Sequence, residues 1–319
     1  MTDADRDGAA SRRSPRPPAL AMRHLCTGAL VTKAGAGLAA ALLAIAYCLS
    51  FSALLFQGGL HQGLAMGLWA LLAGSAVTGL VIGLTSSLAP VAAGPNNPAM
   101  AVLSLLAATI GGAVLSAGGS PDVAVGSVLI SFALATLGTG LVLFGLGAAR
   151  LGQYVRFVPY PVIGGFLAAS GWLLASGGIK VVAGPALVSP DPMSGLIESA
   201  PRLAVAIAFA AVVHLANRAT GRMNALPVVF VAATLVIDAV LWLAGGRAGD
   251  SFDAWYLGGT SAPAGWQPAL LLAGAGVAWP VVLADAPEIA SAAVVTVVAL
   301  LLDVSSLEVA RGRPADLDR

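Results

Sequence analysis

The sequence predicts an all-α polytopic membrane protein, and three observations support this fold class. Of the 319 residues, 58% are hydrophobic and 10% are charged, whereas soluble domains carry about 25% charged residues. The mean hydropathy is +0.90. The apolar residues also gather into runs of about 20, the length that a helix needs to cross a hydrocarbon core of ~30 Å. We therefore expect about eight transmembrane helices and no soluble catalytic domain.

The chain divides into a polar N-terminal segment and an apolar remainder. Residues 1–33 are basic and contain Pro15, Pro17 and Pro18, a composition typical of a disordered tail. This segment is not a signal peptide, because Pro, Arg and Asp residues fill it before the first apolar run. We predict a cytoplasmic tail over residues 1–33 and a membrane domain over residues 34–319.

The apolar runs place the expected spans in order along the chain. They cover about Ala34 to Leu55, Leu64 to Leu84, a helix beginning at Pro98, Val123 to Ala148, Val158 to Val182, Leu203 to Ala216, Leu226 to Ala244, and Ile289 to Ala310. Before the last span, Gln267 to Ala284 is apolar but is interrupted by Gly274, Gly276 and Pro280. We interpret that segment as interfacial or re-entrant rather than as a full span.

The basic residues test this arrangement. With eight spans, all but three of the 16 Lys and Arg residues fall on the side that holds both chain ends, the exceptions being Lys180, Arg202 and Arg247. Positive charge gathers in cytoplasmic loops. We therefore expect both ends in the cytoplasm and the protein in the cell (inner) membrane, with the lipid bilayer as its surroundings.

The stretch from Pro90 to Asn97 is extended and rich in Pro, Gly and Asn, although no Asp, Glu, Lys or Arg occurs from His61 until Asp122. Asn97 suits the N-cap of the following helix, and Pro98 suits its first position. A helix from Pro98 to Ile110 is about 20 Å long, shorter than the ~30 Å core. Two interpretations stay open: a half-helix that begins near mid-membrane, or an interfacial turn before an ordinary span.

A helix start in that position would attract an anion, because its free N–H groups carry a partial positive charge. The candidate substrate ligands are backbone N–H groups with side-chain help, from Asn96, Asn97, Ala99 and Met100. Tyr47 and Ser50 of the first span and Ser104 of the third are further candidates for lining a cavity. Ordinary helix packing is the alternative for these three.

Asp303 is the strongest candidate for ion coupling. It lies well inside the last apolar run, and it shares helical spacing with Thr296, Ala299 and Ser306, which together form one small, polar stripe. An ionisable side chain in a membrane helix usually faces a cavity or a partner. We predict that Asp303, with Thr296, couples a proton or another ion to transport. The alternative is a structural carboxylate near the interface, bonded to a serine or to Arg311.

Other candidate chemistry is weak. His24, His61 and His214 are scattered without ligand spacing, so we expect no metal site, and no cofactor motif occurs. An intramembrane protease or lipid transferase would need paired catalytic groups within the spans, and none are paired here. We therefore predict a protein that is not an enzyme and that binds no nucleic acid.

Several stretches resemble the sulfate permease (SulP) family of inorganic anion transporters. The closest is RLGQYVRFVPYPVIGGFLAASGWLLASGGIKVV, over residues 150–182. The turn from Gly94 to Met100 resembles the family's Gly-Pro turn before its third helix. IAYCLSFSALLF, over residues 45–56, and the last span, from VTVVALLLDV onward, are similar to a bacterial branch of the family.

The resemblance implies a secondary transporter of sulfate-like or bicarbonate-like anions. It implies fourteen segments in two inverted repeats of seven, with this chain carrying the first repeat and the start of the second. The substrate would lie between the third and tenth segments, and a carboxylate on the eighth, here Asp303, would couple an ion. It also implies a homodimer as a partner state.

The chain departs from the family pattern because it stops at Arg319, before the tenth segment and the STAS domain. We therefore expect an N-terminal fragment with half of the anion site, which alone does not transport; uptake of labelled sulfate or bicarbonate by vesicles holding these 319 residues would contradict this. Two alternatives stay open: a non-transporting remnant or assembly partner, and a nucleobase permease of the same fold. The uncharged Gly-Pro-Asn-Asn-Pro turn argues against the nucleobase permease, which would want carboxylates matched to a base edge.

Overall fold

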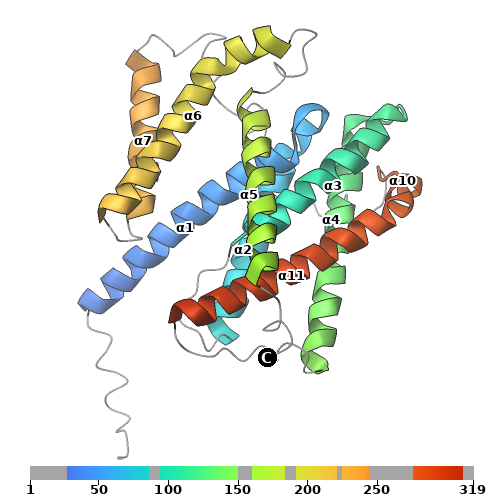
Figure 1. Cartoon of the computed structure of the whole chain (residues 1–319), viewed down its shortest axis with the longest axis horizontal. Helices are drawn as coiled ribbons and strands as arrows, with labels where there is room; N and C mark the ends of the chain where they lie inside the picture. The colour runs from blue at the N-terminus through green and yellow to red at the C-terminus, as the bar shows by residue number, and fades with distance from the viewer. Residues whose placement is uncertain are drawn as a thin grey trace, which may run out of the picture. The chain divides into compact units, whose positions relative to one another are not determined.

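The computed structural model describes residues 27–85, 94–149, 160–183, 192–220, 225–243 and 276–311, and these residues form helices and short turns with no strand. The elements are α1 (Thr27–Leu55), the 3₁₀ turn η3 (Gly58–Gly63), α2 (Leu64–Thr85), α3 (Asn97–Ser116), α4 (Pro121–Ala148), α5 (Tyr160–Ala183), α6 (Pro192–Thr220), α7 (Ala225–Leu243), α10 (Trp279–Ala284) and α11 (Ala286–Arg311) (Figure 1). Their composition and length confirm the predicted fold class.

Seven of the described helices are long and apolar enough to cross a membrane. The remaining expected span, the seventh, is α7, and its apolar stretch is shorter, Val228–Val240. Large apolar side chains are widely exposed on the helices, for example Leu80, Leu141 and Trp172, which are 65%, 75% and 74% exposed. Such surfaces are stable only against lipid or another apolar partner.

Some helix ends differ from the predicted bounds. Helix α1 begins at Thr27, so only residues 1–26 of the expected tail lie outside the described residues; Ala29, Leu30 and Val31 are compatible with a helix and extend it. Helix α6 begins at Pro192, eleven residues before the predicted start of that span at Leu203. Of the interrupted segment from Gln267 to Ala284, residues 276–284 are described, and only α10 within them is helical.

The chain forms two compact units, Met1–Ala41 and Leu42–Arg319. In the first unit, the described residues are the N-terminal part of α1. In the second, α3, α4 and α11 pack against one another, α5 packs on α3 and α6, and α6 packs on α7. The rings of Phe209 and Phe230 meet edge to face between α6 and α7, with centroids 5.1 Å apart.

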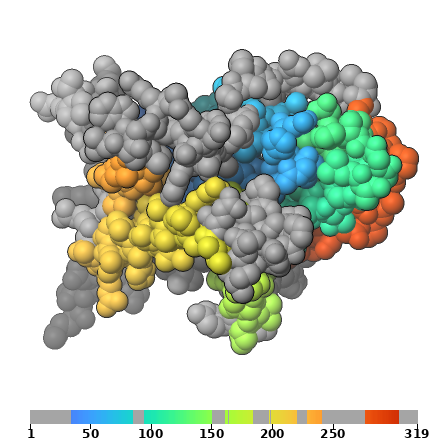
Figure 2. Space-filling view, turned by 90° about the horizontal axis from the view of Figure 1, so that it is seen from above, coloured from blue at the N-terminus to red at the C-terminus, as the bar shows by residue number. Residues whose placement is uncertain are grey.

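The centre of the second unit is an apolar cluster to which α3, α4, α10 and α11 contribute together with the end of α1, η3 and the start of α2. Its fully buried members include Ile110 and Val114 of α3, Val128 of α4, Val282 of α10 and Ala292 of α11. In the space-filling view, the atoms of α3 and α4 adjoin those of α11 on one face (Figure 2). This packing fixes α3 between its neighbours.

Polar contacts and a close approach of the backbones align α4 with α10 and α11. The Ala278 N–H donates to Ser127 Oγ at 2.9 Å, and Thr139 Oγ1 donates to the Ala293 carbonyl at 3.4 Å. Gly126 lies so near Gly276 that a Cβ there would be 2.6 Å from the Gly276 carbonyl oxygen. These hydrogen bonds pair residue 127 with residue 278 and residue 139 with residue 293, so the residue numbers increase in the same direction along both segments. Helices α4 and α11 therefore run in the same general direction.

Helix α3 therefore runs opposite to α11. Residues 117–120 join α3 to α4 in a tight turn, in which Gly118 has a φ of +82° and Ser120 caps α4 by accepting from the Val123 N–H. Two contacting helices joined by so short a turn are antiparallel. As a result, the N-terminal end of α3 meets the C-terminal half of α11 (Figure 1).

Candidate functional site

The start of α3 is capped by Asn96. Its backbone is extended, with φ −82° and ψ 121°, and its side-chain Oδ1 accepts from the Ala99 N–H at 3.0 Å. Its carbonyl oxygen accepts from the Met100 N–H at 2.9 Å. The prediction of Asn97 as the cap was wrong by one residue, because Asn97 is already helical and the chain enters the helix before Pro98.

The predicted end of this helix was also wrong. Helix α3 has 20 residues and runs to Ser116, which makes it about 30 Å long at 1.5 Å per residue. Gly111 and Gly112 lie within it, and the helix ends where Gly118 takes up a positive φ. By length α3 is an ordinary span, as the second of our two interpretations had it, and the half-helix of about 20 Å is not observed.

Asn96 joins α3 to the coupling candidate. Its amide Nδ2 donates a hydrogen bond to Oδ2 of Asp303, 207 positions further along the chain. The two ends of one amide group therefore have separate tasks: the oxygen caps α3, and the nitrogen holds the carboxylate of α11. The sequence had marked both residues, one for the substrate and one for the ion, without relating them.

A carboxylate at this position suits the helix start, because the first turn of α3 carries a partial positive charge. The predicted backbone donors are largely committed in the structure. Ala99 and Met100 donate to Asn96, and Pro98 has no N–H. The backbone N–H of Asn97, whose residue is exposed, has no acceptor among the described residues. An anion at this end of α3 would therefore depend on Asn96 and Asn97.

The remaining predicted residues stay within their own helices. Ser50 donates to the Ala46 carbonyl at 2.9 Å, Ser104 to Ala101 at 2.7 Å and Thr296 to Ala292 at 2.7 Å. Tyr47 is exposed and stacks on Phe51, with ring centroids 6.2 Å apart. None of these four contacts joins its side chain to Asn96 or Asp303.

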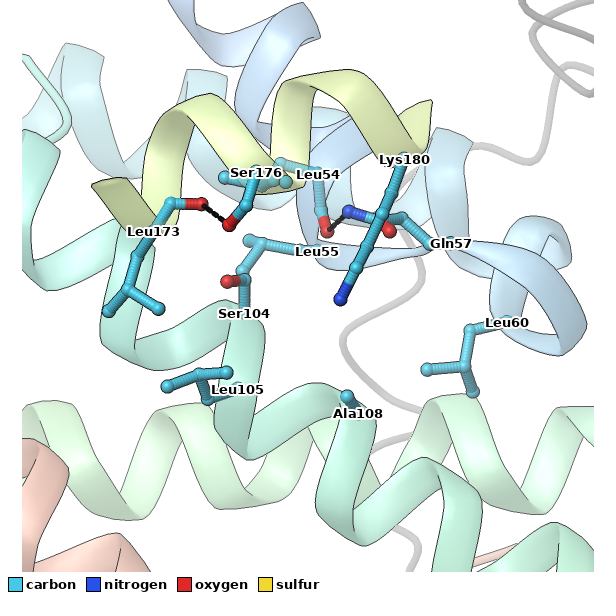
Figure 3. Close-up of a pocket in the computed structure, with 11 residues that line it drawn as sticks. Leu54, Leu55, Gln57, Leu60, Ser104, Leu105, Ala108, Leu173, Ser176 and Lys180 are labelled. Atoms are coloured by element: carbon cyan, nitrogen blue, oxygen red, sulfur yellow. Dashed lines mark hydrogen bonds between the residues drawn. The ribbon is translucent and has the colours of Figure 1, made fainter. Parts of the chain in front are cut away.

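Ser104 instead lines a separate pocket with Lys180, between the end of α1, the middle of α3 and the end of α5 (Figure 3). From the sequence, Lys180 was one of three basic residues expected on the side opposite both chain ends. The one available signal was its rarity: the chain has only two lysines, Lys33 and Lys180. Its approach to α3 depends on how α5 packs.

The structure combines seven long apolar helices with a carboxylate that lies inside one of them and is held against the polar start of another. This combination indicates a membrane transport protein. Intramembrane ionisable residues that face the end of another helix are typical of secondary transporters, where they couple ions to substrates. The described residues contain no group of three His, Cys, Asp or Glu side chains that could hold a metal ion.

Comparison with protein families gives the particular family. The model of the sulfate permease family matches residues 32–311, and the chain belongs to this family. The family consists of anion transporters, not enzymes, so the membrane-enzyme alternative is set aside. Neither the curated proteins nor the solved structures give a match.

Proposed function

We propose that this chain functions in secondary transport of inorganic oxyanions such as sulfate or bicarbonate, with an ion bound at Asp303 as the coupling step. The observation that carries the proposal is the hydrogen bond from the Asn96 amide to the Asp303 carboxylate at the start of α3. It places a negative side chain where an anionic substrate would find both a donor and a favourable helix end.

The geometry makes the carboxylate a competitor of the substrate. While Asp303 is ionised, it occupies the amide donor of Asn96, and its charge repels a second anion. Two like charges that share one amide donor repel each other, and the cost rises as the local dielectric falls. In this state, the start of α3 is closed to substrate.

A proton on Asp303 removes both obstacles. The neutral acid no longer repels the anion, and it releases the amide N–H of Asn96 for the incoming oxyanion. Anion and proton therefore favour each other's binding, and this linkage is reciprocal. Coupling of this sign is the one expected for proton–anion symport, because the affinity for sulfate rises as the pH falls. The side chain of Asp303 is exposed in the structure, so its carboxylate is accessible to an ion.

The membrane orientation belongs to the same proposal. We infer a cell-membrane protein with both ends cytoplasmic, as the basic residues suggest. The shared direction of α4 and α11 supports this, because the fourth and eighth spans of such a chain cross the membrane in the same sense. A ninth span between them would reverse α11.

The test is binding of labelled sulfate to the purified protein in nanodiscs over a pH series. Asn96→Ser keeps a side-chain oxygen that can cap α3 but lacks the amide donor. A hydrogen bond to a charged group is worth about 1.5–3 kcal/mol, so we expect affinity to fall about 10- to 100-fold.

Thr109→Ala, on the exposed side of the same helix, is the matched control, because Thr109 donates to the Leu105 carbonyl of its own helix and to no other described residue. Its affinity should equal that of the unmodified protein. If the affinity for sulfate changes neither with pH nor with Asn96→Ser, the proposal is wrong.

A further inference from the structure

The pocket beside Lys180 is a second candidate site, separate from the start of α3; it is partly open and mainly apolar, with a few polar side chains in its wall. It has a volume of about 140 Å³. Its walls come from the end of α1, the turn η3, the middle of α3 and the end of α5: Leu54, Leu55, Gln57, Leu60, Ser104, Leu105, Ala108, Leu173, Ser176, Gly177 and Lys180. Figure 3 shows the polar members facing one space from different helices.

The close approach of Gly177 to Leu54, together with the packing of α5 on α3, brings Lys180 to this space. Gly177 is buried, and a Cβ there would lie 2.3 Å from Leu54 Cδ1, so a larger residue would require the Leu54 side chain to shift. One turn later, the Lys180 side chain extends from α5 toward α3 with its ammonium group inside the pocket (Figure 3). Lys180 makes no ion pair with any described residue.

The uncharged polar groups add donors around the ammonium. Gln57 uses one amide N–H on the Leu54 carbonyl at 2.8 Å and keeps the other. The hydroxyls of Ser104 and Ser176 donate to carbonyls of their own helices, at 2.7 Å and 3.0 Å. A hydroxyl rotor can leave such a local bond for a better acceptor. Among the described residues that line the pocket none is acidic, so the ammonium of Lys180 has no negative partner among them.

The volume limits the ligand. A cavity of about 140 Å³ exceeds the ~15 Å³ that one water needs, and it falls below the ~300 Å³ at which organic-ligand pockets begin. A pocket of this volume suits one small inorganic ion with a few waters better than it suits an organic substrate.

We propose that this pocket binds a single small inorganic anion, through the Lys180 ammonium with Gln57, Ser104 and Ser176 as further donors. Ser104 follows Asn96 by eight residues, about 12 Å along α3. The pocket is thus a second anion site on the same helix. It does not depend on the site at Asn96, and its occupancy can be measured without transport.

The chain's two lysines allow a direct test. The purified protein, in detergent free of phospholipid, is acetylated briefly with acetic anhydride, and modification of Lys180 and Lys33 is measured by mass spectrometry. Sulfate is compared with gluconate at equal ionic strength, since gluconate is too large for the pocket. We expect sulfate to slow acetylation of Lys180 at least threefold and to leave Lys33, the internal reference, unchanged.

Two variants sharpen the result. Ala108→Leu fills the pocket without changing charge and should abolish the protection, whereas the neighbouring Thr109→Ala should retain it. Asn96→Ser should also retain protection, which separates this site from the proposed coupling site. Equal protection of both lysines, no protection by sulfate, or protection only in nanodiscs of anionic lipid would overturn the proposal.

Discussion

The side-chain amide of Asn96, at the start of α3, donates to the carboxylate of Asp303 in α11, while its oxygen accepts from the Ala99 N–H. One side chain thus fixes the first turn of one helix and the ionisable group of another. Any change in the charge of Asp303 is felt at the start of α3. This relationship is the basis of the first two predictions.

Asp303→Asn should abolish the pH dependence of sulfate binding, because asparagine cannot gain or lose a proton in this range. The matched control is Glu288→Gln in the first turn of α11, where Glu288 is exposed. Binding of labelled sulfate over a pH series measures both. The idea fails if Asp303→Asn keeps the pH dependence of the unmodified protein, or if Glu288→Gln loses it as well.

Asn96→Ala should lower the free energy of unfolding by about 1–2 kcal/mol, the usual loss for an N-cap. Asn97→Ala should change it by less than about 0.5 kcal/mol, as is typical of an exposed side chain. Unfolding in mixed micelles with increasing denaturing detergent gives the comparison. A larger loss of unfolding free energy for Asn97→Ala than for Asn96→Ala would show that Asn97, and not Asn96, is the N-cap.

Gly177→Ala should destabilise the contact between α1 and α5 by about 1–3 kcal/mol, since the new methyl group would overlap Leu54 Cδ1. A flexible leucine end can shift, which places the cost at the lower part of that range. Gly178→Ala, with nothing within 4 Å of its Cβ, should be neutral or stabilising. Thermal unfolding of the two purified variants checks the difference; equal stability would contradict the observed packing.

Gly126→Ala should cost more than Gly177→Ala. Here the new Cβ would lie 2.6 Å from the Gly276 carbonyl oxygen, which is backbone and cannot rotate away. We expect a loss of 2 kcal/mol or more, on the order of the larger overpacking costs. Gly140→Ala on the same helix meets nothing within 4 Å and is the control. If the two variants have the same melting temperature, α4 does not approach residue 276 as described.

The sequence by itself determined the number and placement of most helices. A bilayer requires apolar runs of about 20 residues with their backbone bonds satisfied internally, so hydropathy alone marks where α1, α2, α4 and α11 lie. It also marked Asp303, because a carboxylate in such a run is costly, and Asn96, because a Pro- and Asn-rich turn between apolar runs is unusual.

Only the tertiary structure decided which of these residues meet. The helices are apolar on most sides, so their sequences carry little of the amphipathic pattern that shows which face of a soluble helix is buried. The pairing of Asn96 with Asp303, the shared direction of α4 and α11, and the approach of Lys180 to α3 each depend on helix packing between distant segments. The cap at Asn96 rather than Asn97 depended on one backbone conformation, and sequence preference does not distinguish two adjacent asparagines.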